Sequence, residues 1–239
     1  IVNLAAQAGV RYSVENPREY FYSNMLGFFN ILELSRIYRI KKVLYASSSS
    51  VYGEQKKFPL KENIDLNPKN IYSLSKKNNE EIAEIYKEYY GLNLIGMRFF
   101  TVYGEWGRPD MLMMKYMLAK YRNKKFLLNN KGNHYRDFTY IDDVIKIVIK
   151  LIFLKTKKIN QIFNICSNRP ESVKKILNKI NDLYGKPKIK HQKRLSIEVL
   201  KTHGSNTEIK KVTNFKNFTS LDMGINNLVI WAKKYLKKI

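Results

Sequence analysis

Three kinds of side chain in this sequence could transfer a proton together. They are a hydroxyl from the serine run at residues 47–50, the phenol of Tyr72 and the ammonium of Lys76. Tyr72 and Lys76 are four residues apart, so on a helix they share one face. A nearby lysine charge favours the phenolate, and we expect Lys76 to lower the pKa of Tyr72 from about 10. These residue types predict a site that moves a proton at a hydroxyl group.

The Tyr-x-x-x-Lys spacing carries no information by itself, because tyrosine and lysine are abundant in this chain. Only the copy at Tyr72 follows a serine-rich strand end and opens a helix. The same spacing also occurs at five other places: Tyr38/Lys42, Tyr52/Lys56, Tyr116/Lys120, Tyr121/Lys125 and Tyr184/Lys188. The position of Tyr72, rather than its spacing, therefore singles it out.

Strands alternating with helices must position these groups. The apolar run 43–46 breaks into four hydroxyls, which is typical of a buried parallel strand whose carboxyl end opens into a cleft. A helix is predicted from about residue 71 to residue 90, ending at Gly91, and a short strand over 94–98. Further helices are predicted from an Asn16 N-cap to about residue 38, over 111–121 and 172–184, and from about 221 to the lysine-rich end of the chain, with strands over 126–129 and 161–165. This alternation predicts an α/β fold with a parallel sheet.

Composition limits the other classes of function. The chain has 239 residues, a formal net charge of +24, three histidines and one cysteine. No Cys/His spacing suits zinc, and no apolar run reaches membrane-spanning length, so we expect no metal and no membrane partner. The lysines are scattered rather than grouped on an arginine-rich helix, so we expect no nucleic-acid partner. The excess positive charge would instead attract anionic substrates.

Longer motifs carry a resemblance to a known family. The sequence resembles the extended short-chain dehydrogenase/reductase family of nucleotide-sugar enzymes, and most closely its UDP-glucuronate 4-epimerase branch. The resemblance extends from Asn3 to about Trp231. It rests on five runs: Leu-Ala-Ala-Gln-Ala-Gly-Val-Arg-Tyr-Ser at 4–13, Ser-Ser-Ser-Ser-Val-Tyr-Gly at 47–53, Arg-Phe-Phe-Thr-Val-Tyr-Gly at 98–104, Trp-Gly-Arg-Pro-Asp at 106–110 and Arg-Asp-Phe-Thr-Tyr-Ile-Asp-Asp at 136–143.

This resemblance implies a division of the chain. Residues 1–101, with 138–165 contributing, would form the C-terminal part of an NAD-binding Rossmann domain. Residues 102–239 would mainly form a smaller portion that binds the nucleotide-sugar. In the family a Gly-rich dinucleotide turn precedes the stretch that opens this sequence, and none occurs here. We therefore expect a truncated chain that binds NAD poorly and lacks activity by itself.

The resemblance also implies catalytic roles. Tyr72 would be the general base that takes the proton of the sugar C4 hydroxyl while hydride leaves C4 for NAD. Lys76 would hold the phenolate and the nicotinamide ribose. Alignment on Val-Tyr-Gly at 51–53 makes Ser48 the third catalytic residue, whose hydroxyl would bond the sugar O4. Because four serines are adjacent, the serine one position before or after Ser48 remains an alternative for this role.

Further binding residues follow from the same alignment, although a lone loop arginine is more often a solvated surface residue. The cofactor-binding residues would be Leu4, Ala5, Ala6, Asn24, Tyr72, Lys76 and Phe99. The substrate-binding residues would be Arg11, Ser49, Ser50, Thr101, Arg108 and Arg136. Arginine suits the diphosphate and the carboxylate of such a substrate, because its planar donors bind both in a bidentate manner.

The implied reaction is NAD-dependent conversion of UDP-glucuronate to UDP-galacturonate through a 4-keto intermediate. Related dehydratases and decarboxylases place acidic residues where this chain has Ser49 and Ser50, which favours epimerisation without elimination. The open alternatives are a UDP-glucose/galactose-type 4-epimerase, another nucleotide-sugar epimerase or dehydratase and, remotely, a basic nucleic-acid-binding protein. Two departures from the family stand out, Glu105 for proline and Asn3 for histidine. We expect a cytoplasmic enzyme and leave a homodimer open.

Overall fold

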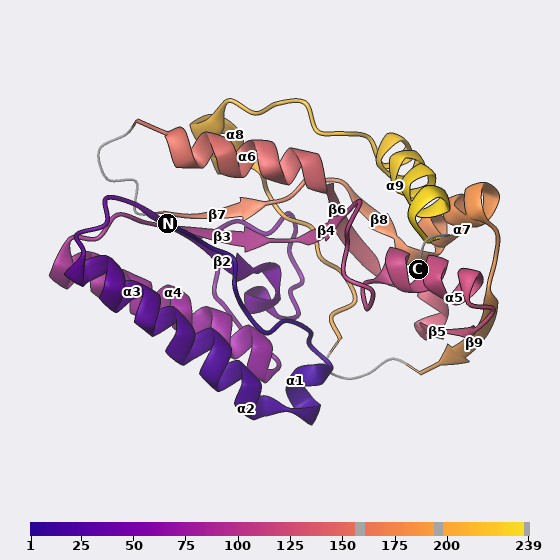
Figure 1. Ribbon diagram of the computed structural model, residues 1–239, viewed down its shortest axis with the longest axis horizontal. Coiled ribbons are helices and arrows are strands. Elements are labelled where there is room, and N and C mark those ends of the chain that lie inside the picture. The colour runs from indigo at the N-terminus through magenta and orange to yellow at the C-terminus, as the bar shows by residue number, and fades with distance from the viewer. Residues whose placement is uncertain (156–160, 194–197, 237–239) are drawn as a thin grey trace.

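The computed structural model describes residues 1–155, 161–193 and 198–236, and its centre is a parallel sheet (Figure 1). Four strands lie in the order β1-β2-β3-β7. They are β1 (Val2–Asn3), β2 (Val43–Ser48), β3 (Leu94–Phe99) and β7 (Gln161–Ile165), and each pair is parallel. The predicted α/β fold with a parallel, Rossmann-like sheet is thus confirmed.

Helices cover both faces of this sheet, which explains why its strands are apolar almost throughout. On one face lie α3 (Gly27–Ile37) and α4 (Ile71–Tyr90), and on the other lie α6 (Ile141–Phe153) and α8 (Thr207–Thr213) (Figure 1). Successive strand residues point to opposite faces. Accordingly Leu94 packs in the cluster under α3 and α4, whereas its neighbour Ile95 packs in the cluster under α6.

Helix α4 has the bounds that the sequence predicts, because both of its ends carry local signals. The Asn70 side chain accepts a hydrogen bond from the Ser73 amide, and the Ser73 hydroxyl accepts one from the Asn70 amide, which forms a capping box. At the other end Gly91 adopts the left-handed conformation, with φ of 66°. Both ends of the helix that carries Tyr72 and Lys76 are therefore fixed.

The helical stretch before β2 is less regular than its apolar period suggests. It consists of α1 (Tyr12–Glu15), α2 (Pro17–Tyr20), a π-helical turn η1 (Phe21–Leu26) and then α3. Asn16, expected as an N-cap, makes no capping bond. Its side-chain amide instead donates to the Tyr12 hydroxyl. Such π turns often occur at functional sites, and this one carries Asn24.

The second half of the chain builds a smaller unit beside the sheet (Figure 1). Strands β4 (Thr101–Tyr103), β6 (Tyr135–Tyr140) and β8 (Pro170–Ser172) form one sheet, and β5 (Lys125–Asn129) pairs with β9 (Lys188–Gln192). Helices α5 (Leu112–Tyr121), α7 (Val173–Tyr184) and α9 (Leu221–Tyr235) enclose its core. The sequence predicted the three helices but missed β4, β8, β9 and α8. The last predicted residues of the closing helix, 237–239, lie outside the described part.

The turn after the serine run depends on a glycine. Residues Ser49–Tyr52 form a 3-10 turn, η2, and Gly53 follows it with φ of 64°. A Cβ at Gly53 would overlap the backbone carbonyl of Asn67, so no larger residue fits without moving that segment. The contact holds the loop after the serines against the segment that leads into α4.

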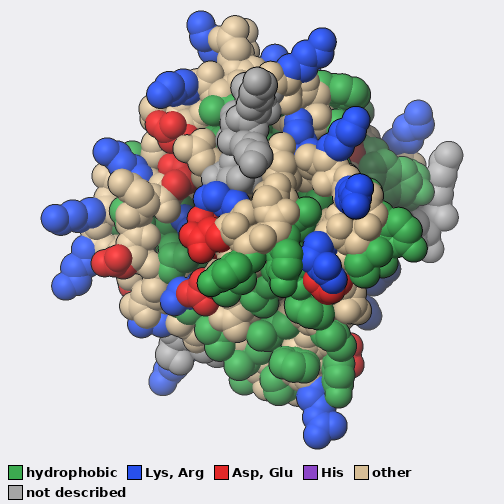
Figure 2. Space-filling view, turned by 90° about the vertical axis from the view of Figure 1, so that its left-hand side faces the viewer, with side chains coloured by type: hydrophobic (Ala, Val, Ile, Leu, Met, Phe, Trp, Pro, Cys, Tyr) green, Lys and Arg blue, Asp and Glu red, His purple; other side chains and the backbone are tan. Residues whose placement is uncertain are grey.

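Figure 2 looks onto the left-hand side of Figure 1, where the sheet strands begin. Hydrophobic side chains cover much of its lower half, and lysine and arginine side chains project around the rim. Exposed apolar residues of α3 and α4 include Leu34, Ile37, Ile85 and Tyr89. None of the helices in the described part of the chain is long and apolar enough to cross a lipid bilayer.

Candidate active site

A cavity of about 550 Å³, here called the inner cavity, opens at the carboxyl ends of the sheet strands. Ligands of open α/β sheets usually bind at this edge. All four residues of the serine run line the cavity, together with Tyr72 and Lys76 from α4. The residues predicted to be catalytic therefore line one cavity, although they come from two elements.

Ser48 and Tyr72 are directly connected. A hydrogen bond joins the Ser48 hydroxyl to the Tyr72 phenol, and the Ser48 oxygen also accepts one from the amide of Ser50 at 3.2 Å. Ser47 instead donates its hydroxyl to Glu80, away from Tyr72. Of these two serines, Ser48 is the one placed to share a substrate oxygen with the phenol.

The expected effect of Lys76 on Tyr72 is not found. Burial raises the pKa of Tyr72, while the Ser48 hydrogen bond and the charge of Arg108 lower it in part. The Lys76 ammonium, only 3 % exposed, donates to the carbonyl oxygen of Ala46 at 2.8 Å. Because that carbonyl holds the ammonium, Arg108 is the cation that acts on the phenol in this structure, and the expectation for Lys76 was wrong.

The buried ammonium of Lys76 predicts an unusual pH dependence of stability. Burial lowers the pKa of Lys76 from 10.5 to about 8. Between these pH values the unfolded chain binds more protons than the folded one, so this residue makes stability rise with pH. A shift of this size corresponds to roughly 3 kcal/mol.

We expect Lys76→Met to remove this rise. Urea unfolding at pH 7.5 and pH 10 would measure it as the difference between the variant and the parent chain. Lys77→Met on the same helix is the matched control, because the Lys77 side chain is a third exposed and pairs with Glu81. An equal change in both variants would contradict the burial argument.

A second cavity of about 690 Å³, the outer cavity, continues from the inner one. Ser49, Ser50, Thr101 and Arg108 line both cavities, so the two form one continuous space. Arg108 donates to both carboxylate oxygens of Asp110, at 3.0 and 2.7 Å, which raises the pKa of the guanidinium. Its position at the junction puts a fixed positive charge near Tyr72.

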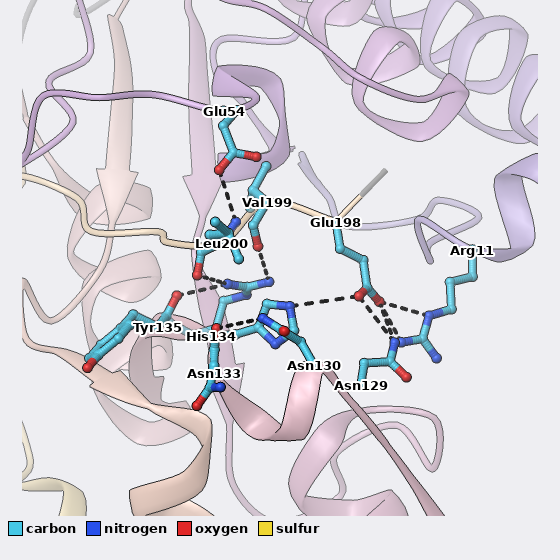
Figure 3. A network of polar contacts seen from close by, with 11 residues as sticks. Arg11, Glu54, Asn129, Asn130, Asn133, His134, Tyr135, Glu198, Val199 and Leu200 are labelled. Carbon is cyan, nitrogen blue, oxygen red and sulfur yellow. Dashed lines mark hydrogen bonds and ion pairs between the residues drawn. The ribbon is translucent and has the colours of Figure 1, made fainter. Parts of the chain in front are cut away.

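Arg11 and Arg136 line the outer cavity, and both bind the segment 198–200; Arg11 does so through Glu198 (Figure 3). The Arg11 guanidinium donates to the Glu198 carboxylate at 3.0 and 2.5 Å, and the Asn129 amide donates to the same carboxylate. Burial raises the pKa of Glu198, but the bonds from Arg11 and Asn129 outweigh it, and the net pKa is lowered. Glu198 is thus an anion held at the wall of this cavity.

Arg136 fastens the same segment by its backbone. Its guanidinium donates to the carbonyl oxygens of Val199 and Leu200, at 2.7 and 3.1 Å, and the amide of Leu200 donates to Glu54 (Figure 3). Two of the three arginines predicted to bind substrate, Arg11 and Arg136, therefore also hold the segment that borders the outer cavity.

The unusual residue Glu105 does not face either cavity. The hydroxyl of Tyr140 donates to the two carboxylate oxygens of Glu105, at 2.9 Å each. Glu105 is absent from the lining of both the inner and the outer cavity. Its charge is therefore turned away from the space in which an anionic substrate would lie.

A buried polar network supports the serine run from behind. The Arg98 guanidinium donates to both oxygens of the Glu80 carboxylate, at 2.9 and 2.7 Å, and to the Tyr52 hydroxyl at 2.9 Å. The Tyr52 hydroxyl in turn donates to Asn164 at 2.7 Å. Glu80 also accepts from Ser47, so the network links the serines to α4, β3 and β7.

Of the remaining residues predicted to bind the cofactor, some line the inner cavity and others do not. Leu4, Ala6 and Phe99 line the inner cavity, whereas Ala5 and Asn24 line neither cavity. The Asn24 amide donates to the Gln7 carbonyl and the Ser75 hydroxyl, at 3.0 Å each, and so joins η1 to α4. Within the described ranges, no group of three or more His, Cys, Asp or Glu residues could hold a metal ion.

Sequence reasoning missed Asn129 and Glu198. Asn129 ends a predicted strand, as the serines do, and that signal could have indicated it. Glu198 follows a lysine-rich stretch and has no local signal, because its role arises only through Arg11 and Asn129.

Comparison with known proteins gives a consistent picture. Residues 1–166 match the NAD dependent epimerase/dehydratase family. Protein CapI of Staphylococcus aureus is 39% identical, over 100% of this chain and 77% of its own length. UDP-glucuronate 4-epimerase 4 of Arabidopsis thaliana is 35% identical, over 98% of this chain and 58% of its own length. The crystal structure of UDP-glucuronic acid 4-epimerase from Bacillus cereus with UDP-glucuronic acid and NAD is 26% identical, with a TM-score of 0.89 over 96% of this chain and 74% of that chain.

Proposed function

The chain belongs to the NAD-dependent epimerase/dehydratase family, and we propose that it carries the catalytic residues for 4-epimerisation of a UDP-sugar. The observation that supports this most strongly is the hydrogen-bonded pair of Ser48 and Tyr72 in a cavity that leads to an arginine-lined second cavity. A proton-transfer pair beside an anion-binding space suits a sugar bound to a diphosphate.

The inner cavity fits the nicotinamide end of NAD. Small residues line it at the carboxyl end of β1, among them Ala6, Ala8 and Gly9, and they let a flat ring approach the backbone. Lys76 is the buried cation that would bind the ribose, with Tyr72 one helical turn away. When bound, NAD supplies the acceptor for the hydride that leaves C4 of the sugar.

The residues of the chain would handle the proton. Ser48 would form a hydrogen bond to the C4 oxygen of the sugar, and Tyr72, as the phenolate, would take the proton of the C4 hydroxyl. The charge of Arg108 would favour the phenolate that accepts this proton. Once the ring has turned its other face and the hydride has returned to C4, Tyr72 would give the proton back to the C4 oxygen, which completes the inversion.

We favour UDP-glucuronate as the substrate. Ser49, Ser50, Thr101 and Arg108 line the junction of the two cavities, and their hydroxyls and guanidinium are suitable donors to a C6 carboxylate. Glu105 is turned to Tyr140, so its charge does not oppose an anion at this junction.

Arg108→Ala tests this choice of substrate. A charge-assisted hydrogen bond contributes roughly 1.5–3 kcal/mol, so kcat/KM for UDP-glucuronate should fall at least about tenfold, and that for UDP-galactose should change less. The assay uses a protein in which a dinucleotide-binding segment precedes this chain, with both sugars competing. Arg18→Ala, an exposed arginine outside both cavities, is the control. An equal loss for both sugars would assign Arg108 to the shared UDP portion and contradict the glucuronate proposal.

A UDP-glucose/galactose 4-epimerase is the second candidate. It is favoured by Asp110, which already binds the Arg108 guanidinium in a bidentate manner and would compete with a substrate carboxylate. The domain division at residue 101, the homodimer, the cytoplasmic location and the absence of a nucleic-acid partner stay predictions.

A further inference from the structure

A third cavity lies away from the proposed active site. This lateral cavity has a volume of about 620 Å³ and lies on the α4 face of the sheet. It shares no lining residue with the inner or the outer cavity. Glu80 separates it from the inner cavity, because the Ser47 hydroxyl that binds Glu80 lines the inner one. A ligand here would not compete directly with the proposed substrate.

The lining of the lateral cavity is more acidic than the rest of this basic chain. Four carboxylates line it, Glu62, Glu80, Glu84 and Glu208, against two ammonium groups, Lys61 and Lys87. The chain as a whole has 44 Lys and Arg against 20 Asp and Glu. Lys87 pairs with Glu84 at 2.5 Å and Arg98 pairs with Glu80, so the negative excess of the lining comes from Glu62 and Glu208. The local field therefore favours a cation although the net charge of the chain does not.

Two of these carboxylates repel one another. Burial raises the pKa of Glu62, and the charge of Glu208 raises it further. The two residues come from distant segments, the loop before α4 and the first turn of α8. A positive group beside Glu208 would relieve this repulsion.

The Tyr45 hydroxyl points to a ligand independently of the acidic residues. Tyr45 on β2 is 3 % exposed and lines the cavity, yet no hydrogen bond to its hydroxyl is found among the described residues. Its oxygen is not one of the fully buried side-chain atoms that lack a partner, so it is open to a donor or acceptor in the cavity. Burial also raises the pKa of this phenol, so it keeps its proton. Its ring needs Gly96 beside it, since a Cβ there would lie 2.7 Å from the Tyr45 oxygen.

We propose that the lateral cavity binds a small organic cation, an alkylammonium or guanidinium compound, between the Tyr45 hydroxyl and the carboxylates of Glu84 and Glu208. The apolar body of the ligand would lie against Ala83, Leu94 and Ile162, which are apolar residues of the lining. An ammonium group can donate to the phenol oxygen and to a carboxylate together, whereas an anion would be repelled.

Calorimetric titration of the 239-residue chain with spermidine tests this proposal. We expect saturable one-to-one binding that weakens about tenfold in Glu84→Gln and measurably in Tyr45→Phe. The controls are Glu88→Gln, an exposed carboxylate of α4 outside the cavity, and Tyr89→Phe, an exposed tyrosine of the same helix. Both should bind spermidine like the parent chain.

Three results would overturn the proposal: no saturable spermidine binding, an equal loss in Glu84→Gln and Glu88→Gln, or tighter binding of 1,8-octanediol than of spermidine. Thermal unfolding of each variant separates a lost site from a lost fold. UDP binding, measured in the same samples, should be unchanged in Tyr45→Phe and Glu84→Gln. A failure of the cation site thus leaves the proposed function untouched, and the reverse also holds.

Discussion

Replacing Tyr72 with phenylalanine is expected to lower kcat for epimerisation by about 10²–10⁴, the range that a positioned general base contributes. The variant loses the phenol that is hydrogen-bonded to Ser48 but keeps the ring that packs edge-on against Tyr20. Binding of the UDP-sugar should therefore be nearly unchanged. Single-turnover kinetics and calorimetry with UDP would measure the two effects separately.

Tyr38→Phe is the matched control for this experiment. Tyr38 also precedes a lysine by four residues, but it is 71% exposed at the end of α3 and lines neither the inner nor the outer cavity. Its loss should leave kcat unchanged. A similar fall in kcat for both variants would show that Tyr72 has no special role.

Replacing Arg98 with methionine should cause the largest loss of stability. The side chains of Arg98 and Glu80 are each only 4% exposed and form a bidentate pair. Removing the arginine leaves a buried carboxylate with the Ser47 hydroxyl, which costs about 3–5 kcal/mol. Chemical unfolding would measure the loss as a lower denaturant midpoint.

Two further variants test whether the loss of stability comes from breaking the buried ion pair or simply from removing an arginine. Arg36→Met removes an exposed partner of Glu33, and such surface pairs contribute at most about 1 kcal/mol. The double variant Arg98→Met with Glu80→Leu should be more stable than Arg98→Met alone, because no unpaired charge stays buried. If Arg98→Met lowers the free energy of unfolding no more than Arg36→Met does, the buried network does not stabilise the fold behind the serine run.

The parts of the fold that the sequence predicts are those with local causes. Helix α4 has an asparagine cap and a terminal glycine, and β2 has an apolar run that ends in hydroxyls, so both could be located from a few residues. Strand β9 has no such signal. It is polar and mostly exposed, and it forms only because its backbone pairs with β5.

The candidate site follows the same division. Tyr72, Lys76 and the serine run could be placed at one strand edge, since parallel strands and the helices between them bring these positions together. The direction in which each side chain points could not be predicted from the sequence. Lys76 turns to the Ala46 carbonyl, Glu105 turns to Tyr140 and Arg11 binds Glu198, and each of these contacts depends on a residue far away in the sequence.

The most direct test of the account uses UDP-glucuronate carrying deuterium at C4. It is given to a protein in which a dinucleotide-binding segment precedes this chain, and the products are followed by NMR. Oxidation and return of hydride at one carbon predict UDP-galacturonate with the deuterium still at C4 and no net consumption of NAD. Loss of the label from C4, a product that has lost water or carbon dioxide, or no inversion in a protein that binds both UDP-glucuronate and NAD would contradict the proposed 4-epimerase.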